Sequence, residues 1–150
     1  MTIKNTEGQT VFDVGIGTLS SNELLFIHAG GYTAGYQQKG SVTVKEKNSQ
    51  EKGETFNFGP ATSPTGSKTG GYAEMLNKTY SVKSDTFYEV TVKIENDQGS
   101  GGKTWSPSTI MPPAQLSAGN YHEKVVTSED LSVPDDVNDT VVRLVWFTKP

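Results

Sequence analysis

Aromatic side chains beside glycines are the residues of this chain best suited to holding a ligand. The clearest case is Trp105, which follows the glycine-dense stretch Asn96–Gly102 and the cation Lys103. Amphipathic rings on loops suit the lipid headgroup interface and also suit stacking on sugar rings. Any one such aromatic residue is more often part of the core, so we predict a binding surface from the set of them and not from a single ring. The candidate ligand-binding residues are Trp105, Lys103, Tyr32, Tyr36, Tyr72 and Tyr121.

A second candidate site is acidic and lies near the end of the chain. Between Ser128 and Asp139 the sequence gathers carboxylates, and Asp135, Asp136 and Asp139 have the oxygen ligands that calcium prefers. Their spacing is not that of an EF-hand loop, and a solvated turn is the simpler interpretation. We therefore expect no metal and no other cofactor.

Catalytic motifs do not occur in the sequence. The two histidines, His28 and His122, stand outside any known motif, and neither a nucleophile elbow nor a zinc-binding HExxH is present. The absence of cysteine excludes disulfides and a thiolate nucleophile. We expect a protein that is not an enzyme.

The charge composition limits which partners the chain can bind. The chain of 150 residues has 13 Lys and Arg against 17 Asp and Glu, a formal net charge of -4, and only one arginine, Arg143. This balance argues against nucleic acid, which requires clustered basic residues. No apolar run approaches a transmembrane span, and the polar N-terminus lacks the apolar core of a signal peptide. We expect a protein that is secreted or released without a visible signal, or otherwise cytoplasmic.

Strand patterns supply the elements that must position these residues. The segment Phe87–Glu95 alternates strictly, with Tyr88, Val90, Val92 and Ile94 on one face and polar residues on the other. The loop Asn96–Lys103 that follows has little apolar surface to bury, so it should project from the fold and move.

Segments further along the chain complete this picture. The apolar stretch Thr140–Thr148 predicts a central strand with Val142, Leu144 and Trp146 in the core. Gly59–Gly71 should form a surface loop, and Leu116–Gly119 one helical turn. About eight to ten short strands with frequent turns predict a single all-β domain over residues 1–150, an antiparallel β-sandwich, with a closed β-barrel as the alternative.

Three pieces of this pattern resemble the C-terminal β-sandwich domain of the cholesterol-dependent, or thiol-activated, cytolysins and its stand-alone relatives. They are the glycine-aromatic segment Gly30–Tyr36, the strand Val92–Glu95 that leads through a glycine loop to Trp105, and the closing Phe147–Pro150. The resemblance implies a membrane-facing recognition module in which Trp105 and the loop Asn96–Lys103 touch lipid. The family's cysteine-bearing, tryptophan-rich loop has no counterpart here, so cholesterol specificity and pore formation are not expected.

These observations lead to one main expectation for function and two alternatives. The main one is a non-enzymatic module that binds a membrane surface as a toxin or haemolysin component. The same aromatic residues fit a carbohydrate-binding lectin, and the exposed edge segments fit a self-assembling structural protein. The expected partners are membrane lipid or glycan, together with a second copy of the chain or a partner toxin subunit.

Overall fold

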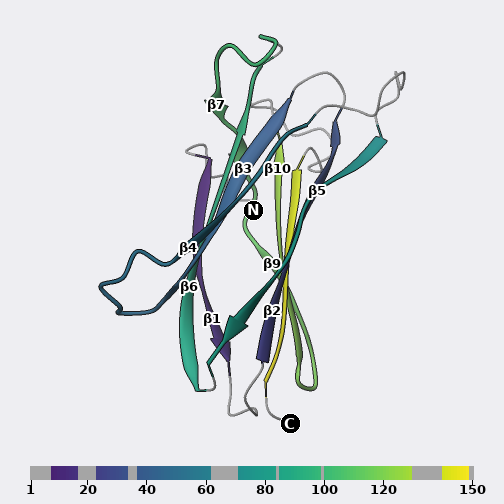
Figure 1. Cartoon of the computed structure of the whole chain (residues 1–150). Coiled ribbons are helices and arrows are strands. Elements are labelled where there is room, and N and C mark those ends of the chain that lie inside the picture. The colour runs from purple at the N-terminus through teal and green to yellow at the C-terminus, as the bar shows by residue number, and fades with distance from the viewer. Residues whose placement is uncertain are drawn as a thin grey trace.

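The computed structural model describes residues 8–16, 23–33, 37–61, 71–83, 85–98, 100–129 and 140–148. In this part of the chain all regular structure is strand (Figure 1). The strands are β1 (Gln9–Ile16), β2 (Glu23–Thr33), β3 (Gln38–Glu46), β4 (Glu54–Ala61), β5 (Gly71–Val82), β6 (Thr86–Asn96), β7 (Ser106–Pro107), β8 (Thr109–Ile110), β9 (Ala114–Ala118), β10 (Tyr121–Glu129) and β11 (Thr140–Phe147).

Two antiparallel sheets face each other. The first has five strands in the order β1-β6-β3-β4, with β7 also paired to β6. The second has six in the order β5-β2-β11-β10-β8, with β9 also paired to β10. Each sheet keeps its own edge strands, so the fold is the predicted antiparallel β-sandwich and not the closed alternative (Figure 1).

Strand β6 occupies the middle of the first sheet, and its alternation explains how the core is built. Tyr88, Val90, Val92 and Ile94 are at most 2% exposed, as their spacing predicts. Partners in register come from β1 and β3, for example Val42 opposite Val92. The residues between them point outward, and they form the polar outer face of the sheet.

The closing strand β11 supplies the matching core of the second sheet. Val142, Leu144 and Trp146 are all buried, which confirms the prediction for this segment. Arg143 stands on the opposite, outer face, where its Nε donates a 2.8 Å hydrogen bond to Glu123. Because the guanidinium is paired and its side chain is 47% exposed, its burial cost is small.

One local prediction is wrong, and another is wrong in part. Leu116 lies in strand β9, which pairs with β10 in a hairpin, and not in a helical turn. The loop predicted over Asn96–Lys103 is anchored at its start, because Asn96 and Asp97 are buried, while Gly101 and Lys103 are exposed as expected. The Asp97 carboxylate accepts hydrogen bonds from the backbone N–H groups of Gln37 at 2.9 Å and Gly102 at 3.0 Å.

Other loop predictions fall partly beyond the described residues. The stretch Gly59–Gly71 begins as the end of β4 and finishes as the start of β5, while residues 62–70 lie outside the described part.

Within the described residues, no helix is long and apolar enough to cross a membrane.

Candidate functional site

The outer face of the first sheet has a hollow at each end. One lies where β6 begins and is lined by Phe87 and residues of the neighbouring turns. The other lies where β6 ends and is lined by residues of β3, β4 and β6. We call them the Phe87 pocket and the Trp105 groove, after the aromatic residue that marks each.

The Phe87 pocket is built on a ring that lies against a glycine. Phe87 pairs with Gly15 across β1 and β6. A Cβ placed on Gly15 would come within 2.7 Å of Cε1 of Phe87, so the ring occupies the space that a side chain would otherwise fill. Phe87 is still 62% exposed, the most exposed large hydrophobic residue in the described part of the chain. The ring is therefore a supported platform with one side open to solvent.

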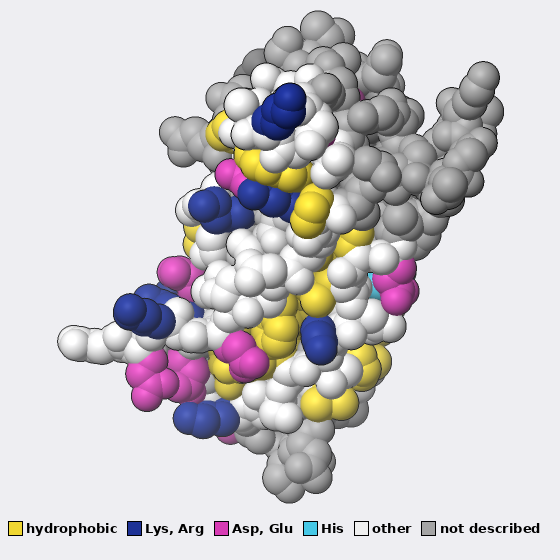
Figure 2. All heavy atoms as spheres, turned by 45° about the horizontal axis from the view of Figure 1, so that its top comes forward, with side chains coloured by type: hydrophobic (Ala, Val, Ile, Leu, Met, Phe, Trp, Pro, Cys, Tyr) yellow, Lys and Arg dark blue, Asp and Glu magenta, His cyan; other side chains and the backbone are white. Residues whose placement is uncertain are grey.

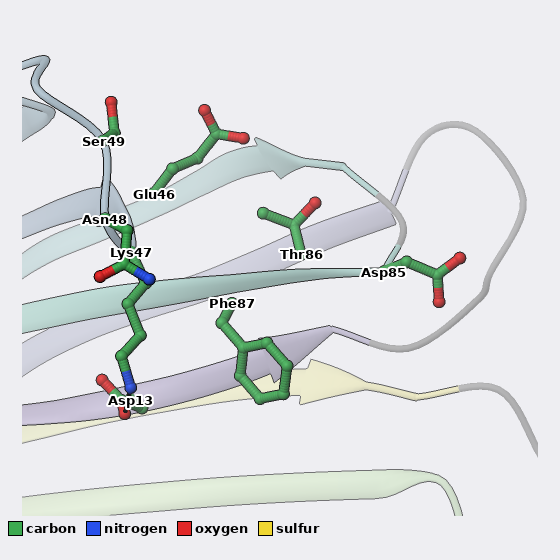
Figure 3. Close-up of a pocket in the computed structure, with 8 residues that line it drawn as sticks. All are labelled: Asp13, Glu46, Lys47, Asn48, Ser49, Asp85, Thr86 and Phe87. Atoms are coloured by element: carbon green, nitrogen blue, oxygen red, sulfur yellow. Dashed lines mark hydrogen bonds and ion pairs between the residues drawn. The ribbon is translucent and has the colours of Figure 1, made fainter.

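Figure 3 shows which polar side chains lie on the side of the Phe87 ring: Lys47 and Asp13 do, while Glu46, Ser49 and Thr86 point the other way. The Lys47 side chain extends alongside the ring to Asp13, and its Nζ donates a 2.5 Å hydrogen bond to Oδ2 of that carboxylate. Lys47 is fixed at its other end as well, because its backbone N–H donates to the carbonyl of Phe87 at 2.8 Å. Acceptor and donor groups thus lie side by side next to an apolar ring.

The pocket is about 630 Å³ and carries negative charge. Its lining is Asp13, Glu46, Lys47, Asn48, Ser49, Asp85, Thr86 and Phe87. Three carboxylates against one ammonium give the lining a formal charge of -2, and one of the carboxylates, Glu46, is paired with Lys83 at 3.3 Å outside the lining. A neutral, hydroxyl-bearing ligand suits these groups, because hydroxyls both donate to carboxylates and accept from ammonium.

The Trp105 groove is smaller, about 360 Å³, and its balance of charge is opposite. Its lining is Lys39, Gly40, Ser41, Asn57, Phe58, Gly59, Lys93 and Glu95. Trp105 adjoins it through Lys39, whose Nζ lies 4.2 Å from the centroid of the indole ring. Figure 2 shows lysine side chains gathered about a hydrophobic patch towards this end of the molecule.

A bulge explains why the sheet is hollowed here. Between Gln38 and Gly40 the register with β4 shifts, so that Gln38 pairs with Ala61 while Gly40 pairs with Phe58. Two residues of β4, Gly59 and Pro60, thus oppose Lys39 alone, and Gly59 has no side chain beside Lys39. Bulges commonly redirect side chains near binding sites.

The predicted aromatic residues do not form one cluster. Trp105 is half-buried and Lys103 exposed, both near β7. Tyr121 lies on the other sheet, where it begins β10 next to the hairpin with β9, and its hydroxyl donates to Glu123 at 2.8 Å. Tyr32 and Tyr72 are paired in register between β2 and β5, and only their backbones are described.

The remaining predicted site residues lie outside the described part of the chain: Tyr36, and the calcium candidates Asp135, Asp136 and Asp139. Among the described residues no group of three or more His, Asp or Glu side chains could hold a metal ion.

Phe87 was not predicted as a site residue, although the sequence carries a signal for it. In the alternation of β6, Phe87 shares the face of Glu89, Thr91 and Lys93. A large aromatic residue on the polar face of a strand is exposed unless another element covers it. Its glycine partner could not be identified, because the pairing with Gly15 depends on the register of β1.

Comparison with known proteins finds similarity to solved structures but none to a family model or a curated sequence. No family model matches the sequence, and no curated protein matches it. The C-terminal domain of the BC2L-C lectin from Burkholderia cenocepacia is 16% identical, with a TM-score of 0.48 over 91% of this chain and 97% of that one. A high-affinity mannose-binding lectin of Ralstonia solanacearum is 19% identical, with a TM-score of 0.48 over 95% and 97%. The Chromobacterium violaceum lectin CV2L, solved with alpha-methyl-fucoside, is 18% identical, with a TM-score of 0.46 over 95% and 97%.

The expected relationship to the cholesterol-dependent cytolysins is wrong. The solved structures that this chain resembles are bacterial lectins, and no family model supports a cytolysin domain. The three short pieces behind that expectation, among them Gly30–Tyr36, are features that unrelated β-sandwiches share.

Proposed function

We propose that this protein is a non-enzymatic carbohydrate-binding protein that holds a neutral sugar in the Phe87 pocket. The observation that carries the proposal is the exposed Phe87 ring, supported from beneath by Gly15 and flanked by the Asp13–Lys47 pair. A pyranose ring has an apolar C–H face that packs on an aromatic ring and a rim of hydroxyls that hydrogen-bond to charged groups.

The charge of the pocket selects among sugars. Glu46 is paired with Lys83, and the two remaining carboxylates, Asp13 and Asp85, outnumber the Lys47 ammonium, so a sugar that bears a carboxylate or sulfate would be repelled. A neutral sugar binds favourably instead, because each of its hydroxyls can donate a hydrogen bond to an ionised carboxylate. Such a bond is stronger than one between neutral groups.

The same features disfavour a lipid surface as the ligand of this pocket. A membrane-binding aromatic residue points its ring away from the protein and has apolar or basic neighbours. The Phe87 ring is packed on Gly15, and it shares its pocket with Asp13 and Asp85, whose carboxylates would repel anionic headgroups. The toxin or haemolysin role is therefore not part of this proposal.

The test is a glycan array that includes neutral and acidic saccharides, probed with the wild type, Phe87→Ala and Val11→Ala. Val11 is the matched control, since it is another exposed hydrophobic residue, at 49%, on the outer face of the same sheet. We expect neutral glycans to bind, and Phe87→Ala to weaken the best of them by about tenfold or more, equivalent to about 1.4 kcal/mol. Val11→Ala should bind as the wild type does.

Two outcomes would overturn the proposal. One is that no glycan binds; the other is that Phe87→Ala binds as well as Val11→Ala. A parallel arm sediments the protein with phosphatidylcholine vesicles, with and without phosphatidylserine. If Phe87→Ala abolishes vesicle binding while the wild type shows no glycan binding, Phe87 serves a lipid surface instead.

A further inference from the structure

Lys39 is held in place by two neighbours that leave its donors available. Its Nζ lies 4.2 Å from the Trp105 ring centroid and 3.7 Å from Oε2 of Glu95. A separation of 3.7 Å is longer than a hydrogen bond, so Glu95 attracts the ammonium without taking up its N–H groups. The cation–π contact with Trp105 orients the ammonium in a similar way. Lys39 also lines the Trp105 groove.

A row of polar side chains continues the groove across three strands. Lys93 on β6 pairs with Ser41 on β3, and Ser41 pairs with Asn57 on β4. All three line the groove. The row therefore offers an ammonium, a hydroxyl and an amide in a line across the sheet, which makes both donors and acceptors available.

Charge distinguishes this groove from the rest of the molecule. Its lining has two ammonium groups, on Lys39 and Lys93, against the carboxylate of Glu95. The whole chain has a formal net charge of -4. Lys103 is exposed two residues before Trp105 and adds positive charge at the same end. An anionic ligand is thus attracted here and repelled from the Phe87 pocket.

We propose that the Trp105 groove is a second binding site, selective for an acidic saccharide. Lys39 and Lys93 bind the carboxylate or sulfate, and Ser41 and Asn57 bind ring hydroxyls. Trp105, whose ring lies under the Lys39 ammonium, holds that ammonium in place. A small free anion would engage the lysines alone, whereas the polar row and the 360 Å³ groove fit a larger hydroxylated body. The inference rests on the proposed function in one respect only, that the ligand is a saccharide.

The experiment measures calorimetric binding of an oligogalacturonate and of its fully methyl-esterified form, which has the same backbone without the charge. We expect the acidic form to bind and the ester to bind at least about tenfold more weakly. Lys39→Gln should lower affinity for the acid by at least about tenfold, and Trp105→Leu, which keeps apolar bulk, should lower it also. Lys45→Gln is the matched control, because Lys45 is on β3, six residues away on the same face, and its loss changes the net charge equally.

Failure of this proposal is separable from failure of the first. Phe87→Ala should leave oligogalacturonate binding unchanged while it weakens binding of neutral glycans. Three results would overturn the second site: no binding of the acidic form, equal losses in Lys39→Gln and Lys45→Gln, or displacement by excess sodium acetate, which would indicate a site for any anion.

Discussion

The phenyl ring of Phe87 lies in the space above Gly15, where a Cβ would come 2.7 Å from Cε1. The two residues are partners in the β1–β6 ladder, so the backbone fixes their positions relative to each other. The conformation of the ring therefore depends on the absence of a side chain at position 15, and this dependence can be tested.

Gly15→Ala should weaken glycan binding with little change in stability. The added methyl group meets only the far end of an exposed side chain, so the ring can tilt away at low cost. We expect the free energy of unfolding to change by less than about 1 kcal/mol. Affinity for the best neutral glycan should nonetheless fall several-fold. In a Phe87→Ala background Gly15→Ala should have no further effect, and an additive loss would refute the platform model.

Trp146→Ala should destabilise the protein by about 3–5 kcal/mol, the usual cost of truncating a buried aromatic residue. Trp146 is 4% exposed, and its indole stacks on His122 with ring centroids 5.6 Å apart. Denaturant unfolding followed by circular dichroism measures the change. Phe26→Ala is the control on the same sheet, where a 41% exposed ring should cost far less. Equal midpoints for the two variants would contradict the assignment of Trp146 to the core.

Asp97→Ala should loosen the loop after β6. The substitution leaves the backbone N–H groups of Gln37 and Gly102 without their carboxylate partner, at a cost of about 1–3 kcal/mol for each donor that stays buried. Hydrogen exchange at these two amides should be slow in the wild type and fast in the variant. Fast exchange at Gly102 in the wild type would show that the loop is as mobile as its composition predicts.

The outer face of the second sheet contributes a dependence of stability on pH. The hydrogen bond from Tyr121, and next that from Arg143, lowers the pKa of Glu123. Because the pKa in the folded state is depressed, the stabilisation is present above the ordinary glutamate value of about 4.3 and is lost as pH falls through the lower, folded value.

Glu123→Gln should therefore reduce the loss of stability in acid. The midpoint of denaturant unfolding, compared at neutral pH and below pH 4, should fall more in the wild type than in the variant. Glu74→Gln is the control, since Glu74 is an exposed carboxylate whose partner is His28. Identical pH profiles for wild type and Glu123→Gln would contradict a role for this carboxylate.

Much of the fold follows from local pattern. The alternation through Tyr88–Ile94 and the apolar run of β11 predict strands, their buried faces and a sandwich, because a period of two needs no knowledge of the partner strand. Strand β9 could not be predicted, since all its residues are exposed and only pairing with β10 orders it. The anchored loop was missed for a similar reason: the partners of Asp97 include Gln37, sixty residues away.

The binding face was less predictable than the core. Trp105 was identified from the loop before it. Its neighbour Lys39 lies on β3, and only the pairing of β3 with β6 brings it close to Trp105. Phe87 and Gly15 are likewise joined only by the ladder between β1 and β6. Sites assembled from cross-strand neighbours depend on register, which one sequence specifies only weakly before its partner strands are known.

Both hollows lie along β6, so this strand holds them at a fixed distance from each other. Phe87 and Glu95 stand eight residues apart on this strand, which at a rise of about 3.3 Å per residue is a span of about 26 Å. Since β6 is hydrogen-bonded to neighbouring strands along this length, the span does not change when side chains move. A ligand with a neutral sugar at one end and an acidic sugar at the other would gain avidity only if its spacer reaches that length, and a shorter one would engage a single hollow at a time.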